Sequence, residues 1–162
     1  MDSQVDIQVV EVTGKLRVDM EARRWCLLPY PGHSKGCPNF GKRRTCPPMV
    51  PEVGHLFDLS GRMWFVFMPF DLGAQAAKMR GRHPEWSERQ ARNCLYWQGT
   101  VNKALRMYAT FFASRQPGSI VTYCPEAMGV HVFDTAEAVG VPLERVPMRL
   151  VRKVAMVGDP HV

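Results

Sequence analysis

The 162-residue chain has no apolar run that approaches the roughly eighteen residues of a membrane-spanning helix. It also lacks low-complexity tracts and internal repeats, which excludes fibrous and solenoid architectures. Its first residues, MDSQVDIQVV, do not have the basic stretch followed by an apolar stretch that marks a secretory signal. With 46% hydrophobic residues, the chain is long enough to bury a core. We therefore expect residues 1–162 to form a single cytoplasmic domain that does not bind a membrane.

Several familiar site motifs are missing too. The chain has no glycine-rich phosphate loop, no nucleophile elbow and no paired histidines of a zinc protease. Cysteines about two to four residues apart, which hold most structural zinc ions, are also absent. The motifs therefore name neither a substrate nor a reaction, and whether the protein is an enzyme stays open.

What the chain does have is three cysteines in one segment rich in proline and glycine. Cys26, Cys37 and Cys46 lie in WCLLPYPGHSKGCPNFGKRRTCPP, whose turn-forming residues bury little apolar surface against the entropy of ordering the backbone. Such a segment needs a cross-link to fold, either a bound metal or a disulfide. The chain has five cysteines, an odd number, and cytoplasmic thiols stay reduced, so a metal is expected in place of disulfides. We expect a metal loop over about residues 22–54, without regular secondary structure.

The spacing of these cysteines favours an iron–sulfur cluster over zinc. Ten residues separate Cys26 from Cys37 and eight separate Cys37 from Cys46, so one long loop would wrap around its ligand. Proline directly follows Cys37 and Cys46, as it does beside the cysteines of ferredoxin-type clusters. Three thiolates would hold three irons of a [4Fe-4S] cluster. The fourth iron would then be open to a small ligand or substrate.

Candidates for the remaining position are Cys124 and His33. Cys124 is also followed by proline, and it is either a fourth ligand or a buried thiol at the end of a strand. His33 lies between two of the loop cysteines, where a histidine is more often simply exposed. If an open iron binds a substrate, Glu126 and His33 are the candidates for proton transfer. Cys94 is expected to be a core thiol on a helix face and not a ligand.

Basic residues surround the cysteines. A positive field lowers thiol pKa values and attracts anions, so a small anionic ligand or a redox partner is expected. The net charge of +6 and the pI near 9.3 also permit a second hypothesis, a zinc-stapled module that binds nucleic acid or another partner. Each basic side chain alone is more simply a solvated loop charge. The residues concerned are Arg23, Arg24, Lys35, Lys42, Arg43 and Arg44.

Two segments resemble an uncharacterised family of predicted metal-binding proteins of bacteria and archaea. CPNFGKRRTCPP is similar to that family's Cys-Pro-Asn-Tyr/Phe-Gly-Lys motif followed by Cys-Pro-Pro, and PEAMGVHVFDTAEAVGVPLE to its C-terminal pattern. The resemblance covers about residues 26–150 and implies metal binding, with Lys42 beside the cofactor, but no reaction. Many relatives carry further cysteines before the second motif, where this chain has only Cys124. The matching positions are Cys37, Gly41, Lys42, Cys46, Pro47 and Pro48, then Glu126, Ala127, Met128 and Gly129.

Hydrophobic periodicity predicts the remaining elements. The nearly continuous apolar run at 63–70 indicates a strand buried on both faces, in the centre of the sheet. Ser87 and Gln90 form the pattern of a capping box, which predicts a long helix from there to Ser114. We expect an α/β or α+β fold in which the long helix covers a single sheet and the cysteine loop lies at an edge or end.

The other predicted strands are 5–12, 15–20, 119–123, 130–133 and 148–157, and the other predicted helices are 72–80 and a short one opened by Asp134 with Glu137 and closed by Gly140. A spacing of three and four residues predicts the buried face of the long helix. That face would carry Cys94, Trp97, Val101, Ala104, Tyr108 and Phe111.

Overall fold

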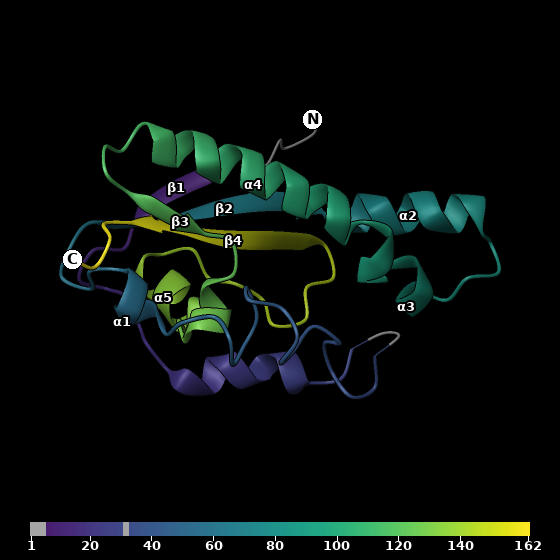
Figure 1. The fold of residues 1–162 in the computed structure, drawn as a ribbon. Coiled ribbons are helices and arrows are strands. Elements are labelled where there is room, and N and C mark those ends of the chain that lie inside the picture. The colour runs from purple at the N-terminus through teal and green to yellow at the C-terminus, as the bar shows by residue number, and fades with distance from the viewer. Residues whose placement is uncertain (1–5, 31–32) are drawn as a thin grey trace.

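The computed structural model describes residues 6–30 and 33–162, and an antiparallel sheet of four strands lies at its centre. In order across the sheet these strands are β1 (Gln8–Glu11), β2 (Met63–Asp71), β4 (Leu150–Gly158) and β3 (Ile120–Thr122). Helices cover both faces of the sheet (Figure 1). The fold is α+β with a single sheet and a long covering helix, as the sequence predicts. Val5, where the first predicted strand begins, lies outside the described residues.

The two long strands form the middle of the sheet. β2 and β4 pair along their whole length, from Met63 opposite Gly158 to Asp71 opposite Leu150. Alternate side chains of β2 enter different cores: Phe65 and Phe67 lie on one side and Val66 on the other. Because a core covers each face of β2, apolar residues occupy successive positions of the strand and do not alternate with polar ones. The prediction of a central strand is confirmed.

One face of the sheet packs against α4 (Gln98–Ser114), which runs along β2 and β4 (Figure 1). Val101, Leu105 and Ala109 are its buried residues. They meet side chains of the central strands that include Val66 and Ala155. This interface forms the first of the two main cores.

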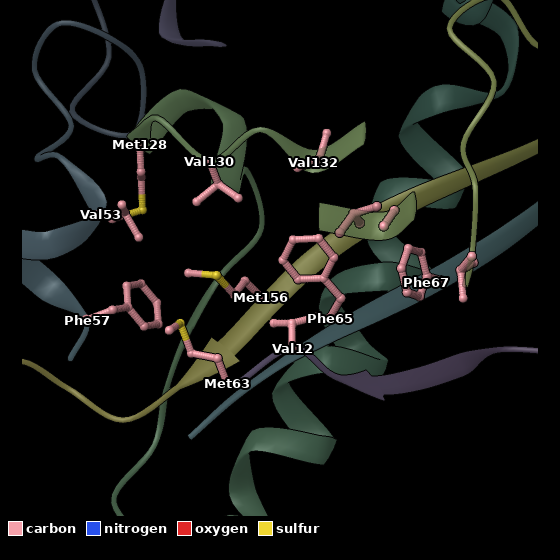
Figure 2. Close-up of a cluster of buried hydrophobic side chains, with 13 residues drawn as sticks. Val12, Val53, Phe57, Met63, Phe65, Phe67, Met128, Val130, Val132 and Met156 are labelled. Carbon is pink, nitrogen blue, oxygen red and sulfur yellow. The ribbon is translucent and has the colours of Figure 1, made fainter. Parts of the chain in front are cut away.

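The opposite face packs against short elements. These are α5 (Val132–Ala138), α1 (Val53–Leu56) and the 3₁₀ helix η3 (Pro125–Met128), over which the 3₁₀ helix η1 (Met20–Leu27) is laid. Figure 2 shows Phe65 and Met156 of the sheet directed toward Met128, Val130 and Val132. This second core lies beneath the segments that carry Cys26 and Cys124.

A helical arm extends past the end of the sheet. α2 (Leu72–Arg82) follows β2 directly, with the Asp71 carboxylate accepting a hydrogen bond from the amide of Ala74 at its start. α3 (Glu88–Ala91) folds back against α2, and the 3₁₀ helix η2 (Cys94–Tyr96) leads into α4. The prediction of a helix at 72–80 is confirmed, and the helix runs two residues further.

The predicted helix from Ser87 to Ser114 is wrong in its first half. Ser87 and Gln90 do form a capping box, but it starts only the four residues of α3. Asn93 then accepts a hydrogen bond from the amide of Leu95 and starts η2, because asparagine side chains compete with helical backbone bonds. Cys94 therefore lies outside α4.

This break changes which face of α4 is buried. The predicted stripe extrapolates from Cys94 and places Ala104 and Phe111 in the core. In the structure Ala104 is exposed and Phe111 is 56% exposed, whereas Leu105 is only 3% exposed. The phase of the helix is set by where α4 begins, after Trp97.

Two predicted strands are absent from the part of the chain that the structure describes. In 15–20, Val18 forms only an isolated bridge with Val130, and Asp19 caps η1. In 130–133, the His131 Nδ1 accepts a hydrogen bond from the amide of Asp134 and starts α5 three residues early. The predicted capping box of Asp134 with Glu137 is therefore wrong. The prediction that 22–54 has no regular secondary structure is also too simple, since this range contains most of η1 and the first two residues of α1.

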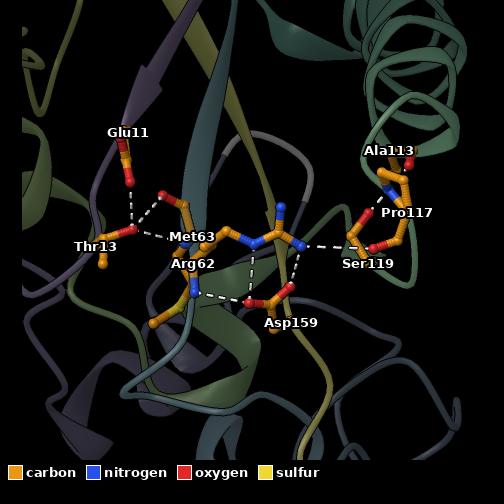
Figure 3. A network of polar contacts seen from close by, with 8 residues as sticks. All are labelled: Glu11, Thr13, Arg62, Met63, Ala113, Pro117, Ser119 and Asp159. Atoms are coloured by element: carbon orange, nitrogen blue, oxygen red, sulfur yellow. Dashed lines mark hydrogen bonds and ion pairs between the residues drawn. The ribbon is translucent and has the colours of Figure 1, made fainter.

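A polar network ties strand ends together (Figure 3). The backbone amide of Arg62 donates to Asp159 Oδ2 at 2.9 Å, and its guanidinium donates to Asp159 Oδ1 at 2.8 Å. These hydrogen bonds lower the pKa of Asp159, so its carboxylate stays ionised at neutral pH. Beside them, the amide of Met63 donates to the Thr13 hydroxyl at 3.0 Å.

Within residues 6–30 and 33–162, no helix is both long and apolar enough to cross a membrane.

The observed phase of α4 predicts opposite outcomes for two neighbouring residues. Leu105→Ala should lower the free energy of unfolding by about 2–5 kcal/mol, because it leaves a cavity against the sheet. Met107→Ala, at a position 67% exposed, should change it by less than about 0.5 kcal/mol. Denaturant titration measures both. A large loss in Met107→Ala with a small one in Leu105→Ala would restore the phase that buries Ala104 and Phe111.

Candidate metal centre

Three of the other cysteines gather around Cys26, which lies in the last turn of η1. Burial raises the pKa of the Cys26 thiol, and the nearby charges of Cys37, Glu126 and Cys46 raise it further. The charge of Cys26 likewise contributes to the raised pKa of the Cys124 thiol, so Cys124 also lies near Cys26. All five cysteines of the chain are free thiols of intermediate exposure. The fold thus collects thiols from η1, from the loop and from the segment before η3.

The segments that carry Cys26 and Cys124 are docked by backbone contacts. The amide of Asp19 donates to the carbonyl of Gly129 at 2.8 Å, next to the bridge between Val18 and Val130. Gly129 has φ +95, and a Cβ there would lie 2.2 Å from a methyl carbon of Met20. The Glu-Ala-Met-Gly turn therefore packs directly on the helix that carries Cys26.

Cys37 is fixed to Cys26 through the main chain. The amide of Cys37 donates to the carbonyl of Cys26 at 2.6 Å. Gly36, the preceding residue, has φ +88, and a Cβ on it would lie 2.5 Å from the same carbonyl oxygen. Only glycine fits both the left-handed conformation and the close approach. The sequence Lys-Gly-Cys thus positions the second cysteine beside the first.

The end of the loop is held by Arg23. Its mostly buried side chain donates to the carbonyl of Val50 at 2.6 Å and of Pro48 at 3.3 Å, and lies 3.8 Å from a carboxylate oxygen of Glu52. Cys46 lies just before these anchored residues. From the sequence, Arg23 is expected only to supply positive charge. Its hydrogen bonds in the structure instead attach the end of the loop to η1.

Cys124 has a carboxylate partner. Its thiol donates to Glu126 Oε1 at 3.3 Å. Burial first, and then the negative charge of Glu126, raise the pKa of the Cys124 thiol well above its ordinary value. Glu126 also contributes to the raised pKa of Cys26. Of the two proton-transfer candidates, Glu126 is the one that lies among the thiols.

Tyr30 is a neighbour of the site that the sequence analysis missed. Burial raises the pKa of its hydroxyl, followed by the charge of Cys37 and a hydrogen bond with that side chain, while Cys94 and Cys26 contribute less. The His33 ring packs against the Tyr30 ring at a tilt, with centroids 4.8 Å apart, and so adjoins the cysteines through this residue. The sequence feature that could have identified Tyr30 is its position between the first two cysteines of the loop.

Cys94 packs against the core beneath α4 from its position in η2, so it is partly buried without lying on the α4 stripe. Apart from Arg23, the basic side chains expected near the cofactor are exposed. Lys42, whose amide donates to the carbonyl of Asn39 at 3.0 Å, is one of these. The others are Arg24, Lys35, Arg43 and Arg44.

The donors suit a soft metal more than a hard one. Sulfur dominates the group, with one carboxylate at its side, and thiolates select iron–sulfur clusters or zinc over oxygen-preferring cations. Within the described ranges, no three His, Cys, Asp or Glu side chains are arranged to hold a metal ion. The fit is therefore one of donor chemistry and proximity. No protein-family model, curated protein or solved structure matches this chain.

The contact of Gly36 with Cys26 predicts a difference between two glycines of the loop. Gly41 also has a left-handed φ of +73, but a Cβ there would meet nothing within 4 Å. Gly41→Ala should cost about 1 kcal/mol of backbone strain. Gly36→Ala adds a clash with backbone atoms and the loss of the hydrogen bond between Cys37 and Cys26, so it should cost about 2 kcal/mol or more.

Denaturant titration measures the two costs, and alkylation rates read by mass spectrometry report the exposure of each thiol. The Cys37 thiol should be alkylated faster in Gly36→Ala than in the parent protein. In Gly41→Ala it should be alkylated at the parent rate. Equal stability and equal labelling in the two variants would contradict the close approach.

Proposed function

We propose that this protein binds an iron–sulfur cluster, a [4Fe-4S] cluster held by Cys26, Cys37 and Cys46. The observation that carries the proposal is the gathering of thiols from separate segments around Cys26. Cysteine thiolates are the ligands that hold such clusters, and this group supplies them. Cys124 and Glu126, which lie near Cys26, would be neighbours of such a cluster.

The residues of the chain prepare this site in two ways. The hydrogen bond from Cys37 to Cys26 fixes the relative positions of two thiols, and Arg23 holds the segment that follows the third. These contacts do not involve a metal, so they orient the donors before any cofactor binds. A cluster supplies electron transfer when four protein ligands close it, and a Lewis-acidic iron when one position stays open.

We favour the open position, because the Cys124 thiol already donates to Glu126. Glu126 Oε1 is then placed to hold a proton for a small ligand bound beside it. His33 is a weaker candidate, since it reaches the group only through Tyr30. Exposed Lys42 and its basic neighbours would attract an anionic ligand or an acidic redox partner.

The family resemblance supports the same proposal. Its two motifs are far apart in the sequence, yet Glu126 of the second influences the thiol of Cys26, next to Cys37 of the first. Gly129 of the second motif accepts the hydrogen bond that docks η1. Metal binding by the matching residues would explain why two motifs that are far apart in the sequence lie in contact.

The proposal predicts the metal content of protein purified without oxygen. It should be brown and contain iron and sulfide in about equal amounts. Cys37→Ser should lose both, because a hydroxyl is a poor cluster ligand. Cys94→Ala should keep full iron and cost about 1 kcal/mol of stability through lost packing.

Absorbance, iron and sulfide assays and denaturant titration provide these readouts. Colourless protein with one bound zinc would replace the cluster by the zinc-stapled module. Full iron in Cys37→Ser, or loss of iron in Cys94→Ala, would show that the ligands have been wrongly assigned.

Cys124→Ala separates an open site from a closed one. With an open position, this variant should retain its iron, and the parent protein should change its electronic or paramagnetic spectrum when a small thiol is added. Glu126→Gln is the matched variant, because it removes the carboxylate and keeps the thiol. Iron loss in Cys124→Ala alone, without a spectral response in the parent, would indicate four thiolate ligands and a role in electron transfer or structure.

A further inference from the structure

A hollow in the helical arm lies between α2 and α3, and none of the cysteines lines it. Its volume is about 440 Å³, within the range of sites that hold small ligands. Small residues of α2 form part of its lining. These residues are Gly73, Ala76, Ala77 and Gly81.

Two guanidinium groups stand at the rim of the hollow. Arg80 and Arg92 each pair with the single carboxylate of Glu88, so two positive charges face one negative charge. Arg92 is only 21% exposed and also donates from Nε to the carbonyl of Met148 at 3.1 Å, which fixes its orientation. Arg80 is half exposed, and its guanidinium pairs with the Glu88 carboxylate.

Gly81 leaves the hollow open near the end of α2. It is the penultimate residue of the helix, it is exposed, and it belongs to the lining of the hollow. Its φ is not left-handed, and a Cβ on it would meet no atom of the described chain within 4 Å. The space that a side chain would fill belongs to the hollow. A glycine at this point keeps room for a ligand against the helix backbone.

We propose that this hollow binds a phosphomonoester with a flat apolar body, of the size of a nucleoside monophosphate. The phosphate would replace Glu88 between Arg80 and Arg92, since a dianion balances two guanidiniums and offers enough oxygens for bidentate hydrogen bonds. The body would lie on the small residues of α2, next to Gly81. This site does not depend on the proposed cluster.

Isothermal titration of the full chain with AMP, adenosine and inorganic phosphate tests the proposal. AMP should bind at least about tenfold more tightly than either part alone, because each part uses only one half of the hollow. Arg80→Gln should weaken AMP binding about tenfold or more, as expected for the loss of a hydrogen bond to a charged group.

Arg82→Gln is the matched control. Arg82 is an exposed residue of the same helix and does not line the hollow, yet its substitution changes the net charge equally. It should change the affinity by less than about twofold. Gly81→Leu should abolish binding while the protein remains folded, since leucine favours the helix and fills the space.

Absence of AMP binding would overturn the proposal, as would AMP binding no tighter than inorganic phosphate. Equal losses in Arg80→Gln and Arg82→Gln would reduce it to nonspecific attraction by a basic surface. Unchanged affinity in Gly81→Leu would place the ligand elsewhere. Iron content enters none of these readouts, so failure here leaves the cluster proposal unaffected.

Discussion

The contact between η1 and the turn after Cys124 is the constraint on which the candidate site depends. The hydrogen bond from Asp19 to Gly129, with the bridge from Val18 to Val130 beside it, joins two segments that are about a hundred residues apart. Because the same turn contributes Met128 and Val130 to the core, η1 is docked on a fixed base. The thiols of Cys26 and Cys124 become neighbours as a result of ordinary hydrophobic packing.

The two long strands were predictable from the sequence because their signal is local. β2 is a nearly continuous apolar run, and its burial on both faces follows from the composition alone, whereas β4 is marked by apolar alternation around Arg152 and Lys153. α4 was harder, since it carries apolar residues at Ala104 and Phe111 as well as at Leu105 and Phe112. The correct stripe depends on the start of the helix, and the side chain of Asn93 moves that start.

The site was predictable only in part. The spacing of the three loop cysteines made them candidates, and the structure brings Cys37 and Cys46 within electrostatic reach of Cys26. The approach of Cys124 and Glu126 depends on tertiary docking, which no local pattern contains. Likewise, nothing in the sequence separates Arg23, which holds the loop, from Arg24 beside it, whose side chain is 69% exposed. Metal binding itself stays a prediction.

The two attachments of the loop have an entropic consequence. The hydrogen bond from Cys37 to Cys26 closes one short ring of chain, and the bonds from Arg23 to Pro48 and Val50 close a second. Each doubling of a flexible ring adds about 0.6 kcal/mol to the cost of closing it, and folding has already met that cost here. A ligand that bridges the cysteines would restrict only short arcs of chain. Its binding free energy would then reflect the strength of the metal–sulfur bonds more than the ordering of a long loop.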